Sequence, residues 1–536
     1  MYLETNYFTN KKGKTTYRYF LRESYWDEGK VKKRTIVNLT GLITDIQAEN
    51  LRIALKSKTI LQKEDTHQGI SIGAILVFKK LADEMGITKA LGKTQDGKLA
   101  LWQIISRIIY QSSRLGAVKY GKLHSITSVL KMDKFDENHL YKNLDWLTQK
   151  QAIMEKKLFK HREKTHGVNE IFLYDVTSSY FEGKHNELSY FGYNRDKKRG
   201  KKQIVIGLLT DKEGYPLSVE VFNGNTSDPK TVSNQLEKIK KKFKAKNIVF
   251  VGDRGMIKSE GITDIYNNGY HYITGITKPQ INKLIKEKVI EIGLFDEKLS
   301  EIESDNIRYV LRLNPVRKEE TELMREEKYQ SLVTLLENRN KYLSEHPRAD
   351  VDVAIKKVET FAKKLKISKW IILTSDKKNR ILTLKKDENI LKEESKLDGC
   401  YVLKTDLTKE KADKETVHLR YKDLANVEFA FKRFKTTSLN IRPIHVRKES
   451  RTRGHVFVVM LAYILIRELE KRWKDLPITL EQGINELNQI QYNDIYRSKQ
   501  YLYSEIPTLR ESTNELLKAA NITFTKKEIK TRLQIT

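Results

Sequence analysis

The chain has 536 residues, which is too long for one hydrophobic core, and usual domain sizes of about 100–200 residues predict two to four domains. Charged residues make up 32% of it and hydrophobic residues 39%, a balance that excludes a disordered protein. Lys and Arg number 101 against 70 Asp and Glu, a formal net charge of +31. This excess predicts a polyanionic partner, of which nucleic acid is the leading one.

The sequence shows no feature typical of a membrane or secreted protein. Its longest apolar run, 456–466, has 11 residues, short of the ~18 needed to span a membrane, and predicts a buried core helix instead. The first residues lack the apolar segment of a secretory signal. Cys400 is the only cysteine, which excludes intrachain disulfides and suits a reducing compartment. We expect a cytoplasmic protein with no membrane partner.

The N-terminal part predicts a β-rich unit followed by a helical domain. Segments 16–26 and 31–42 are β-rich and are joined by a turn at 27–30. From Ile70 to Leu147 apolar residues recur at helical spacing. The β-rich unit could bind DNA or only carry surface charge, and both interpretations stay open. That the helical domain binds a DNA end is a hypothesis, because no helix-turn-helix pattern stands out.

The next part of the chain predicts three strands, a helix and a fourth strand, in that order. Segments 171–177, 203–210 and 215–222 predict three antiparallel strands, with a turn at 211–214. A helix opens with Asp228 as N-cap and Pro229 at its first position, and a buried strand at 247–252 leads to Asp253. Asp175 lies inside the first predicted strand, and if that strand is buried, the carboxylate needs a partner or a metal ion. The alternative interpretation is that Asp175 ends a strand at the surface.

This order of three strands, a helix and a strand is typical of the ribonuclease H-like arrangement, in which the first and fourth strands are neighbours. Asp175 and Asp253 would then face each other at one end of the sheet. Two converging carboxylates need a cation between them. A third acid from a later helix would complete a site for two Mg²⁺ ions.

Residues 421–435 supply that acid. The segment has no Gly or Pro, and its apolar residues recur at steps of three and four, so it predicts one amphipathic helix with the buried face Leu424, Val427, Phe431 and Phe434. Tyr421, Glu428 and Lys435 are each seven apart and would form one stripe. The carboxylate could hold a metal ion and the flanking side chains a phosphate, although an ordinary surface stripe would look the same.

Two basic clusters, at 194–202 and 432–453, could contact DNA or only add solubility. The second begins on the helix of Glu428, which favours phosphate contact. The DNA-binding residues predicted from the clusters and the stripe are Tyr421, Lys435, Lys432, Arg433, Arg195, Lys198 and Arg199. His445 and His455 have no partner at zinc spacing, which favours a surface or capping role.

The fold class expected from these elements is α/β: a ribonuclease H-like catalytic core interrupted by an insertion domain and preceded by a small β unit and a helical domain. Trp370 in the insertion could stack on a base, but a core position is favoured. The expected domains are a β-rich unit at 1–60, a helical DNA-end-binding domain at 61–165, the first part of the core at 166–277, the insertion at 278–396, the second part with the glutamate helix at 397–475, and a helical region at 476–536.

On these motifs the chain resembles the DDE transposases of bacterial insertion sequences, in the subgroup with a Tyr-Arg-Glu-Lys signature. Its spacing falls on Tyr421, Glu428 and Lys435, while Leu424 stands where the signature has Arg. Further similarity lies in Tyr-Asp-Val-Thr-Ser-Ser-Tyr-Phe-Glu at 174–182, in 214–228, in Gly-Asp-Arg-Gly at 252–255, and in 398–406.

The resemblance implies an enzyme that cleaves the ends of an insertion sequence and joins them to target DNA. It implies catalysis by two Mg²⁺ ions, replaceable by Mn²⁺, on Asp175, Asp253 and Glu428. It also implies a homodimer on paired double-stranded DNA ends, at the bacterial nucleoid. A metal-dependent nuclease without strand transfer is the first alternative. A DNA-binding protein of the same fold without cleavage is the last, because all three acids are present.

Overall fold

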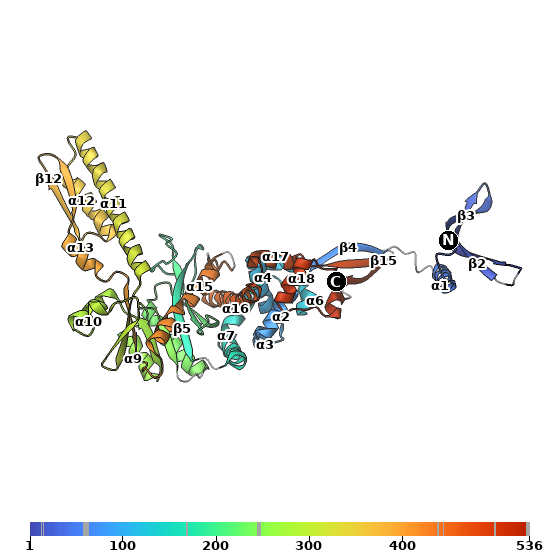
Figure 1. Cartoon of the computed structure of the whole chain (residues 1–536), viewed down its shortest axis with the longest axis horizontal. Helices are drawn as coiled ribbons and strands as arrows, with labels where there is room; N and C mark the ends of the chain where they lie inside the picture. Colours follow the sequence, from blue (N-terminus) through green and yellow to red (C-terminus); the bar gives the residue numbers. More distant parts are fainter. Residues whose placement is uncertain are drawn as a thin grey trace. The chain divides into compact units, whose positions relative to one another are not determined.

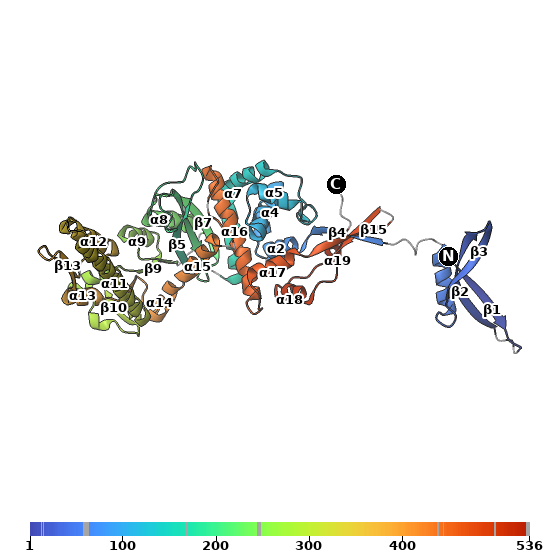
Figure 2. The ribbon, with the colours of Figure 1, turned by 90° about the horizontal axis from the view of Figure 1, so that it is seen from above.

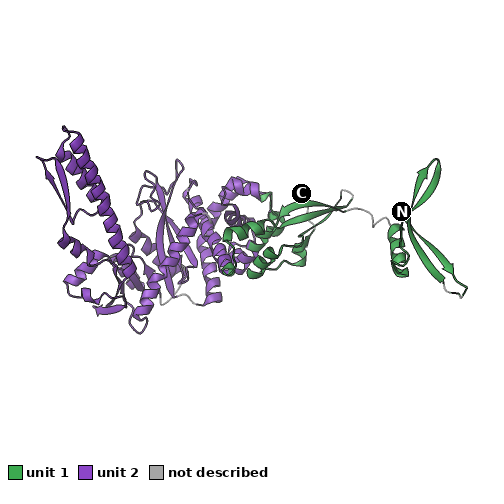
Figure 3. Cartoon of the chain, turned by 45° about the horizontal axis from the view of Figure 1, so that its top comes forward, with its two compact units in different colours: residues 1–77, 121–131, 472–536 green, residues 78–120, 132–471 purple. Residues whose placement is uncertain are grey.

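The structure, a computed structural model whose elements are labelled in Figures 1 and 2, describes residues 1–11, 13, 15–56, 64–167, 170–243, 248–436, 439–442, 444–497 and 500–531. The chain divides into two compact units, coloured separately in Figure 3. Unit 1 comprises Met1–Val77, Gly121–Lys131 and Arg472–Thr536, and unit 2 comprises Phe78–Tyr120 and Met132–Lys471. The domain boundary expected at residue 60, and Asn247 at the start of an expected strand, lie outside the described residues.

Unit 1 begins with an antiparallel three-stranded sheet, β1 (Tyr2–Thr9), β2 (Thr15–Asp27) and β3 (Lys30–Asn38). Glu28 and Gly29 both have positive φ, as the tight turn between twisted strands requires. Helix α1 (Asp45–Lys56) packs Ala48 against Leu3 and Tyr19. The predicted hairpin is therefore confirmed, and β1 is additional to it.

The rest of unit 1 contains a second antiparallel sheet, in the order β17-β16-β15-β4. Its strands are β4 (Glu64–Ser71), β15 (Gln491–Arg497), β16 (Gln500–Glu505) and β17 (Lys530–Thr531), and its helices include α6 (Ile126–Leu130), α17 (Leu480–Asn488), α18 (Glu511–Ala519) and α19 (Lys526–Ile529). The prediction that 476–536 is helical is wrong at β15 and β16. Their Tyr-rich sequence suits a half-buried pleated surface better than a helix.

The helices predicted between Ile70 and Leu147 are confirmed. They are α2 (Gly73–Glu84), α3 (Ile87–Leu91), α4 (Gln95–Tyr110), α5 (Arg114–Gly121), α6 and α7 (Glu137–His166). The apolar run 456–466 is buried throughout, within α16 (Glu449–Trp473), as predicted. A Cβ on Gly454 would lie 2.3 Å from the carbonyl oxygen of Leu144, so α16 crosses α7 at close range.

Unit 2 is built on an eight-stranded mixed sheet, in the order β10-β11-β14-β9-β8-β5-β6-β7. Its strands are β5 (Ile171–Tyr180), β6 (Gln203–Thr210), β7 (Pro216–Phe222), β8 (Val249–Gly252), β9 (His271–Gly275), β10 (Ser300–Ser304), β11 (Ile307–Leu313) and β14 (Cys400–Thr405). β8 is parallel to β5 and β9, and the other pairs are antiparallel. The predicted adjacency of the first and fourth strands, β5 and β8, is confirmed.

Helices cover both faces of this sheet, so β5 and β6 are buried along most of their length, and 204–209 of β6 is a continuous apolar run. α8 (Asp228–Lys238) and α9 (Ser259–Asn267) lie on one side in Figure 2, and α14 (Lys414–Lys422) and α15 (Leu424–Lys435) on the other. The π-helical turn η1 (Ile239–Phe243) directly follows α8. The N-cap of α8 is Ser227, so the prediction of Asp228 as N-cap is wrong. The carboxylate of Asp228 instead accepts a hydrogen bond from Arg195 at 2.6 Å.

Segment 278–396 both extends the sheet and forms a core of its own. Besides β10 and β11 it contains α10 (Lys278–Lys286), the 3₁₀ turn η2 (Ile292–Leu294), α11 (Pro315–Glu345), α12 (Val351–Leu365), β12 (Ile371–Asp376), β13 (Ile381–Lys386) and α13 (Glu388–Ser395). Trp370 is 4% exposed in the core of this segment, as the favoured interpretation predicts. No helix among the described residues is long and apolar enough to cross a membrane.

Candidate active site

Asp175 and Asp253 occupy equivalent positions on neighbouring strands. In the parallel pair of β5 and β8, Tyr174 is the register partner of Gly252, and each aspartate is the next residue along its chain. Side chains alternate along a strand, and the Tyr174 ring packs near Phe250, so Asp175 points to the opposite face. The sequence-predicted pair therefore lies together at one end of the sheet.

The environment of Asp175 carries an excess of negative charge. The pKa of its carboxyl is raised to about 7, chiefly by burial and in addition by the charges of Asp253 and Glu428. The backbone N–H of Val176, which donates to Oδ1 at 2.7 Å, and the charge of Arg195 oppose this rise. Asp253 and Glu428 are thus near enough to affect the ionisation of Asp175.

The segment predicted as one helix is two helices. It breaks at Asp423, so Tyr421 lies on α14 whereas Glu428 and Lys435 lie on α15, and the prediction of a single stripe is wrong. Asp423 is the C-cap of α14 and the N-cap of α15, and its carboxylate accepts a hydrogen bond from the Arg420 guanidinium at 3.3 Å. The predicted apolar face is confirmed, because Leu424, Val427, Phe431 and Phe434 are all buried.

Tyr421 still reaches the site from α14. Its hydroxyl donates a hydrogen bond to Oδ1 of Asp253 at 3.1 Å. Burial, together with the charge of Asp253, raises the pKa of the Tyr421 hydroxyl, so it remains a donor at neutral pH. A Cβ on Gly275 would lie 2.7 Å from the Tyr421 hydroxyl oxygen, so this glycine leaves room for the phenol.

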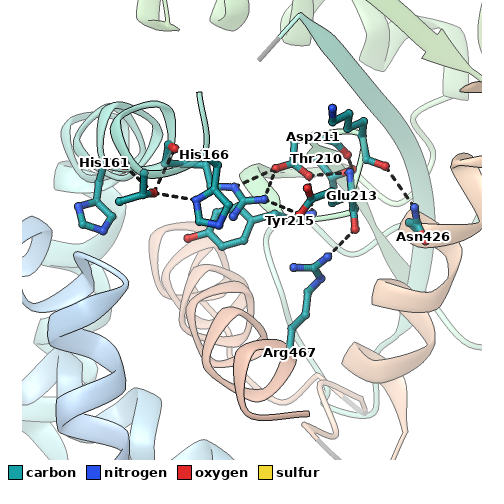
Figure 4. A network of polar contacts seen from close by, with 11 residues as sticks. His161, His166, Thr210, Asp211, Glu213, Tyr215, Asn426 and Arg467 are labelled. Atoms are coloured by element: carbon teal, nitrogen blue, oxygen red, sulfur yellow. Dashed lines mark hydrogen bonds and ion pairs between the residues drawn. The ribbon is translucent and has the colours of Figure 1, made fainter. Parts of the chain in front are cut away.

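The turn between β6 and β7 holds α15 in place (Figure 4). Asn426, two positions before Glu428, donates to the carbonyl oxygen of Lys212 at 3.2 Å, and Arg467 of α16 donates to that of Glu213 at 2.6 Å. Arg162 of α7 pairs with the carboxylates of Asp211 and Glu213, both at 2.9 Å. One turn therefore ties the glutamate helix to two long helices.

Asp196 lies next to the predicted DNA-binding residues and is not among the predicted site residues. Its side chain is 2% exposed, and Oδ1 pairs with Lys435 Nζ at 2.8 Å and with the Arg442 guanidinium at 2.7 Å. Oδ2 accepts the backbone N–H of Tyr180 at 3.1 Å. The only signal in the sequence is that Asp196 is the single acid of the basic cluster 194–202.

Some of the other predicted DNA-binding residues pair with acidic side chains, and others are exposed. Arg195 pairs with Asp228, and Arg433 pairs with Glu470 and lies over the Phe429 ring, whereas Lys432, Lys198 and Arg199 are exposed. Their contacts with DNA stay predictions. His445 is exposed as expected.

His455 is not at the surface, and that prediction is wrong. It is 5% exposed, because α16 is buried along this part of its length.

The side chains of the three predicted acids are not grouped into a metal site. Across the described ranges, no three His, Cys, Asp or Glu side chains are grouped so that they could hold a metal ion. Asp175, Asp253 and Glu428 act on one another through their charges, and a shared ion would require their side chains to converge.

Residues 166–465, more than half of the chain, match the model of the transposase DDE domain, and the chain therefore belongs to the DDE transposases. Enzymes of this class cut and join DNA with divalent metal ions. Residues 4–68 match the N-terminal domain of IS1634 family transposases, which makes the protein a bacterial insertion-sequence transposase. This assignment favours transposition over the two alternative functions. The Tyr-Arg-Glu-Lys subgroup stays a prediction.

The chain is also similar to solved transposase structures. A piggyBac transposase synaptic complex with hairpin DNA matches at 8% identity and a TM-score of 0.36, with 80% of this chain and 82% of that chain covered. The Mos1 transposase paired-end complex matches at 11% identity and 0.15, covering 43% and 67%, and the Mos1 strand transfer complex at 12% and 0.15, covering 43% and 66%. None of the curated proteins matches the chain.

Proposed function

We propose that Asp175, Asp253 and Glu428 are the catalytic carboxylates of this transposase, in a ribonuclease H-like core. The observation that carries the proposal is the parallel pairing of β5 and β8, which sets Asp175 of β5 beside Asp253, the residue directly after β8, with Glu428 close enough to raise the pKa of Asp175. The sheet order β7-β6-β5-β8-β9 supports the ribonuclease H-like assignment.

The donor set fits a divalent cation, and we assign Mg²⁺, with Mn²⁺ able to replace it. Three carboxylates supply the hard oxygen ligands that Mg²⁺ prefers. The pKa of Asp175 is raised chiefly by burial and also by the charges of Asp253 and Glu428, and a cation between the acids would relieve both effects. When bound, such ions activate a hydroxyl nucleophile and stabilise the leaving oxygen during phosphoryl transfer.

The chain's own residues hold the acids and the DNA. Tyr421 orients the Asp253 carboxylate, and the turn at 211–215 positions α15 and so Glu428. Asp196 holds Lys435, which we assign to the DNA backbone. We assign the same role to Tyr421, Lys432, Arg433, Arg195, Lys198 and Arg199.

The partners that follow are double-stranded element ends and target DNA. Two ends must be cut and joined together, so we propose a homodimer on paired ends, acting at the nucleoid. The net charge of +31 supports a polyanionic partner of this size.

The test is cleavage of DNA carrying the element's ends, with Mg²⁺, Mn²⁺ or EDTA, by wild type and by Asp175→Asn, Asp253→Asn and Glu428→Gln. Each variant should bind DNA normally and cleave at least 10³-fold more slowly. Glu415→Gln is the matched control, because Glu415 is an exposed acid on the adjoining helix α14. Unchanged cleavage by Glu428→Gln, or a loss equal to that of Glu415→Gln, would refute the assignment.

A further inference from the structure

A cavity of about 310 Å³ lies within unit 2, away from the three acids. It is lined by α4, the residues that lead into α5, α7, the segment after α15, and α16. The side chains that define it are Arg107, Arg114, Tyr141, Arg442, His445 and His455. Its lining contains no Asp or Glu.

Two of the arginines that line this cavity are almost completely buried. Each of Arg107 and Arg114 is 7% exposed. The other two buried arginines of the described residues both have acidic partners: Arg162 pairs with Asp211 and Glu213, and Arg308 pairs with Glu301 at 2.7 Å. Among the described residues, Arg107 and Arg114 have no acidic partner, although a buried charge normally needs one.

The contacts these two arginines do make leave their charge uncompensated. Arg107 donates to the carbonyl oxygen of Gln111 at 3.0 Å, and Arg114 lies 3.1 Å from Nδ1 of His455. The Nε atoms of both are buried without a hydrogen-bond partner. Burial lowers the pKa of Arg107 to about 10 and that of Arg114 to about 9, and in Arg114 the charge of Arg107 adds to the effect.

We propose that this cavity binds a phosphate group through Arg107 and Arg114, and that in the working enzyme the group is a phosphodiester of bound DNA. The guanidinium fork matches phosphate oxygens in pairs, and a buried charged contact of this kind is strong. The assignment to DNA rests on the proposed function, whereas the phosphate chemistry rests on the cavity alone.

The cavity is also connected to the catalytic strand. Arg442 lines it and pairs with Asp196, whose other carboxylate oxygen accepts the N–H of Tyr180 at the end of β5. Lys435 of the glutamate helix shares Asp196. The lining residue Arg442 is therefore linked through Asp196 to the elements that carry Asp175 and Glu428.

The test uses the full chain in EDTA, so that no cleavage occurs. Fluorescence anisotropy measures binding to duplex DNA over a range of salt concentrations, and thermal unfolding is followed with and without inorganic phosphate. The variants are the double variant Arg107→Met/Arg114→Met and, as matched control, Arg317→Met, a surface arginine 70% exposed and paired with Glu320.

We expect the double variant to bind DNA about tenfold more weakly, with a salt slope lower by about one per lost phosphate contact. Its Tm should equal or exceed that of wild type, because uncompensated buried charges are removed. Phosphate should raise the Tm of wild type and of Arg317→Met but not that of the double variant. If the phosphate effect is lost while DNA binding is unchanged, the cavity takes free phosphate, and its assignment to DNA is wrong.

The proposal is overturned if DNA affinity, salt slope and the phosphate-induced shift all match wild type, or if only the Tm falls, which would indicate a structural role. Should the double variant fail to fold, Arg107→Lys/Arg114→Lys keeps both charges but loses the fork. It should then keep the salt slope and still bind phosphate more weakly than wild type. None of these readouts depends on Asp175, Asp253 or Glu428, so failure here leaves the catalytic assignment intact.

Discussion

The hydroxyl of Tyr421 donates a hydrogen bond to Oδ1 of Asp253 at 3.1 Å, across the junction between α14 and the end of β8. Because the phenol fixes one oxygen of this acid, Tyr421→Phe should slow the cleavage step of bound DNA about tenfold, the usual worth of a hydrogen bond to a charged group, beyond any loss of DNA affinity. Single-turnover cleavage measures this. Tyr266→Phe, at a 74% exposed tyrosine, is the control, and an equal effect of both variants would contradict the role.

Cleavage should depend on the ionisation of Asp175. Its pKa is raised from 3.8 to about 7, chiefly by burial, so below pH 7 an increasing fraction is protonated and cannot bind a cation. The rate should rise about tenfold per pH unit up to pH 7 and then level off. Higher Mg²⁺ should move the midpoint to lower pH, because metal and proton compete. A midpoint independent of Mg²⁺ would contradict this assignment.

The carboxyl group of Asp175 should also make the folding stability of the chain depend on pH. The folded chain binds the Asp175 proton more tightly than the unfolded chain, so stability is lost as the pH rises from about 4 to 7. Asp175→Asn cannot ionise and avoids this loss. In metal-free buffer its Tm should exceed that of wild type by a few degrees at pH 8 and equal it at pH 4, as calorimetry can measure. A lower Tm of the variant at pH 8 would contradict the prediction.

How far the sequence predicts this site depends on whether a residue belongs to a local pattern. The apolar runs of β5 and β8 predict buried strands, and their order places Asp175 beside Asp253. The spacing of Leu424 and Val427 predicts the buried face of α15. These predictions succeed because periodicity within one element reports burial directly.

The remaining features come from contacts between distant segments, which leave no local period. The role of Asp196 depends on two cations that lie more than 200 positions further along the chain. β15 is a strand because β4 lies beside it, and the two pair across more than 400 residues. Spacing along the sequence cannot reveal such partners.

The position of α15 should depend on the glycine at residue 214. Its φ is +78°, and a Cβ there would lie 2.6 Å from Cβ of Asn426, on the helix of Glu428. Gly214→Ala should therefore cost stability through its backbone and, in addition, shift α15 and slow cleavage at least tenfold. Gly269→Ala is a matched control, because Gly269 has a φ of +72° and open space around it. It should lose about 1 kcal/mol of stability and keep its activity.

Gly214→Ala with wild-type cleavage would show that α15 tolerates the displacement, and the turn at 211–215 would then have no role in positioning Glu428. The measurement is single-turnover cleavage at a temperature well below the Tm of both variants, so that partial unfolding does not affect the rate.

Replacing Asp196 should lower the free energy of unfolding far more than replacing a surface acid. Its nearly inaccessible carboxylate compensates both Lys435 and Arg442, so Asp196→Asn leaves two partly buried cations without their partner. Removing one member of a buried ion pair costs about 3–5 kcal/mol. Asp352→Asn is the control, because Asp352 pairs with Lys377 at 2.8 Å on the surface, where such a pair contributes about 0–1 kcal/mol.

Chemical denaturation of both variants measures the difference. DNA should offset part of the loss in Asp196→Asn, because its phosphates can take the place of the missing carboxylate beside Lys435 and Arg442. Added duplex should therefore raise the Tm of Asp196→Asn by more than it raises the Tm of wild type. Equal shifts would mean that neither cation reaches the DNA backbone, and the assignment of Lys435 to phosphate binding would have to be withdrawn.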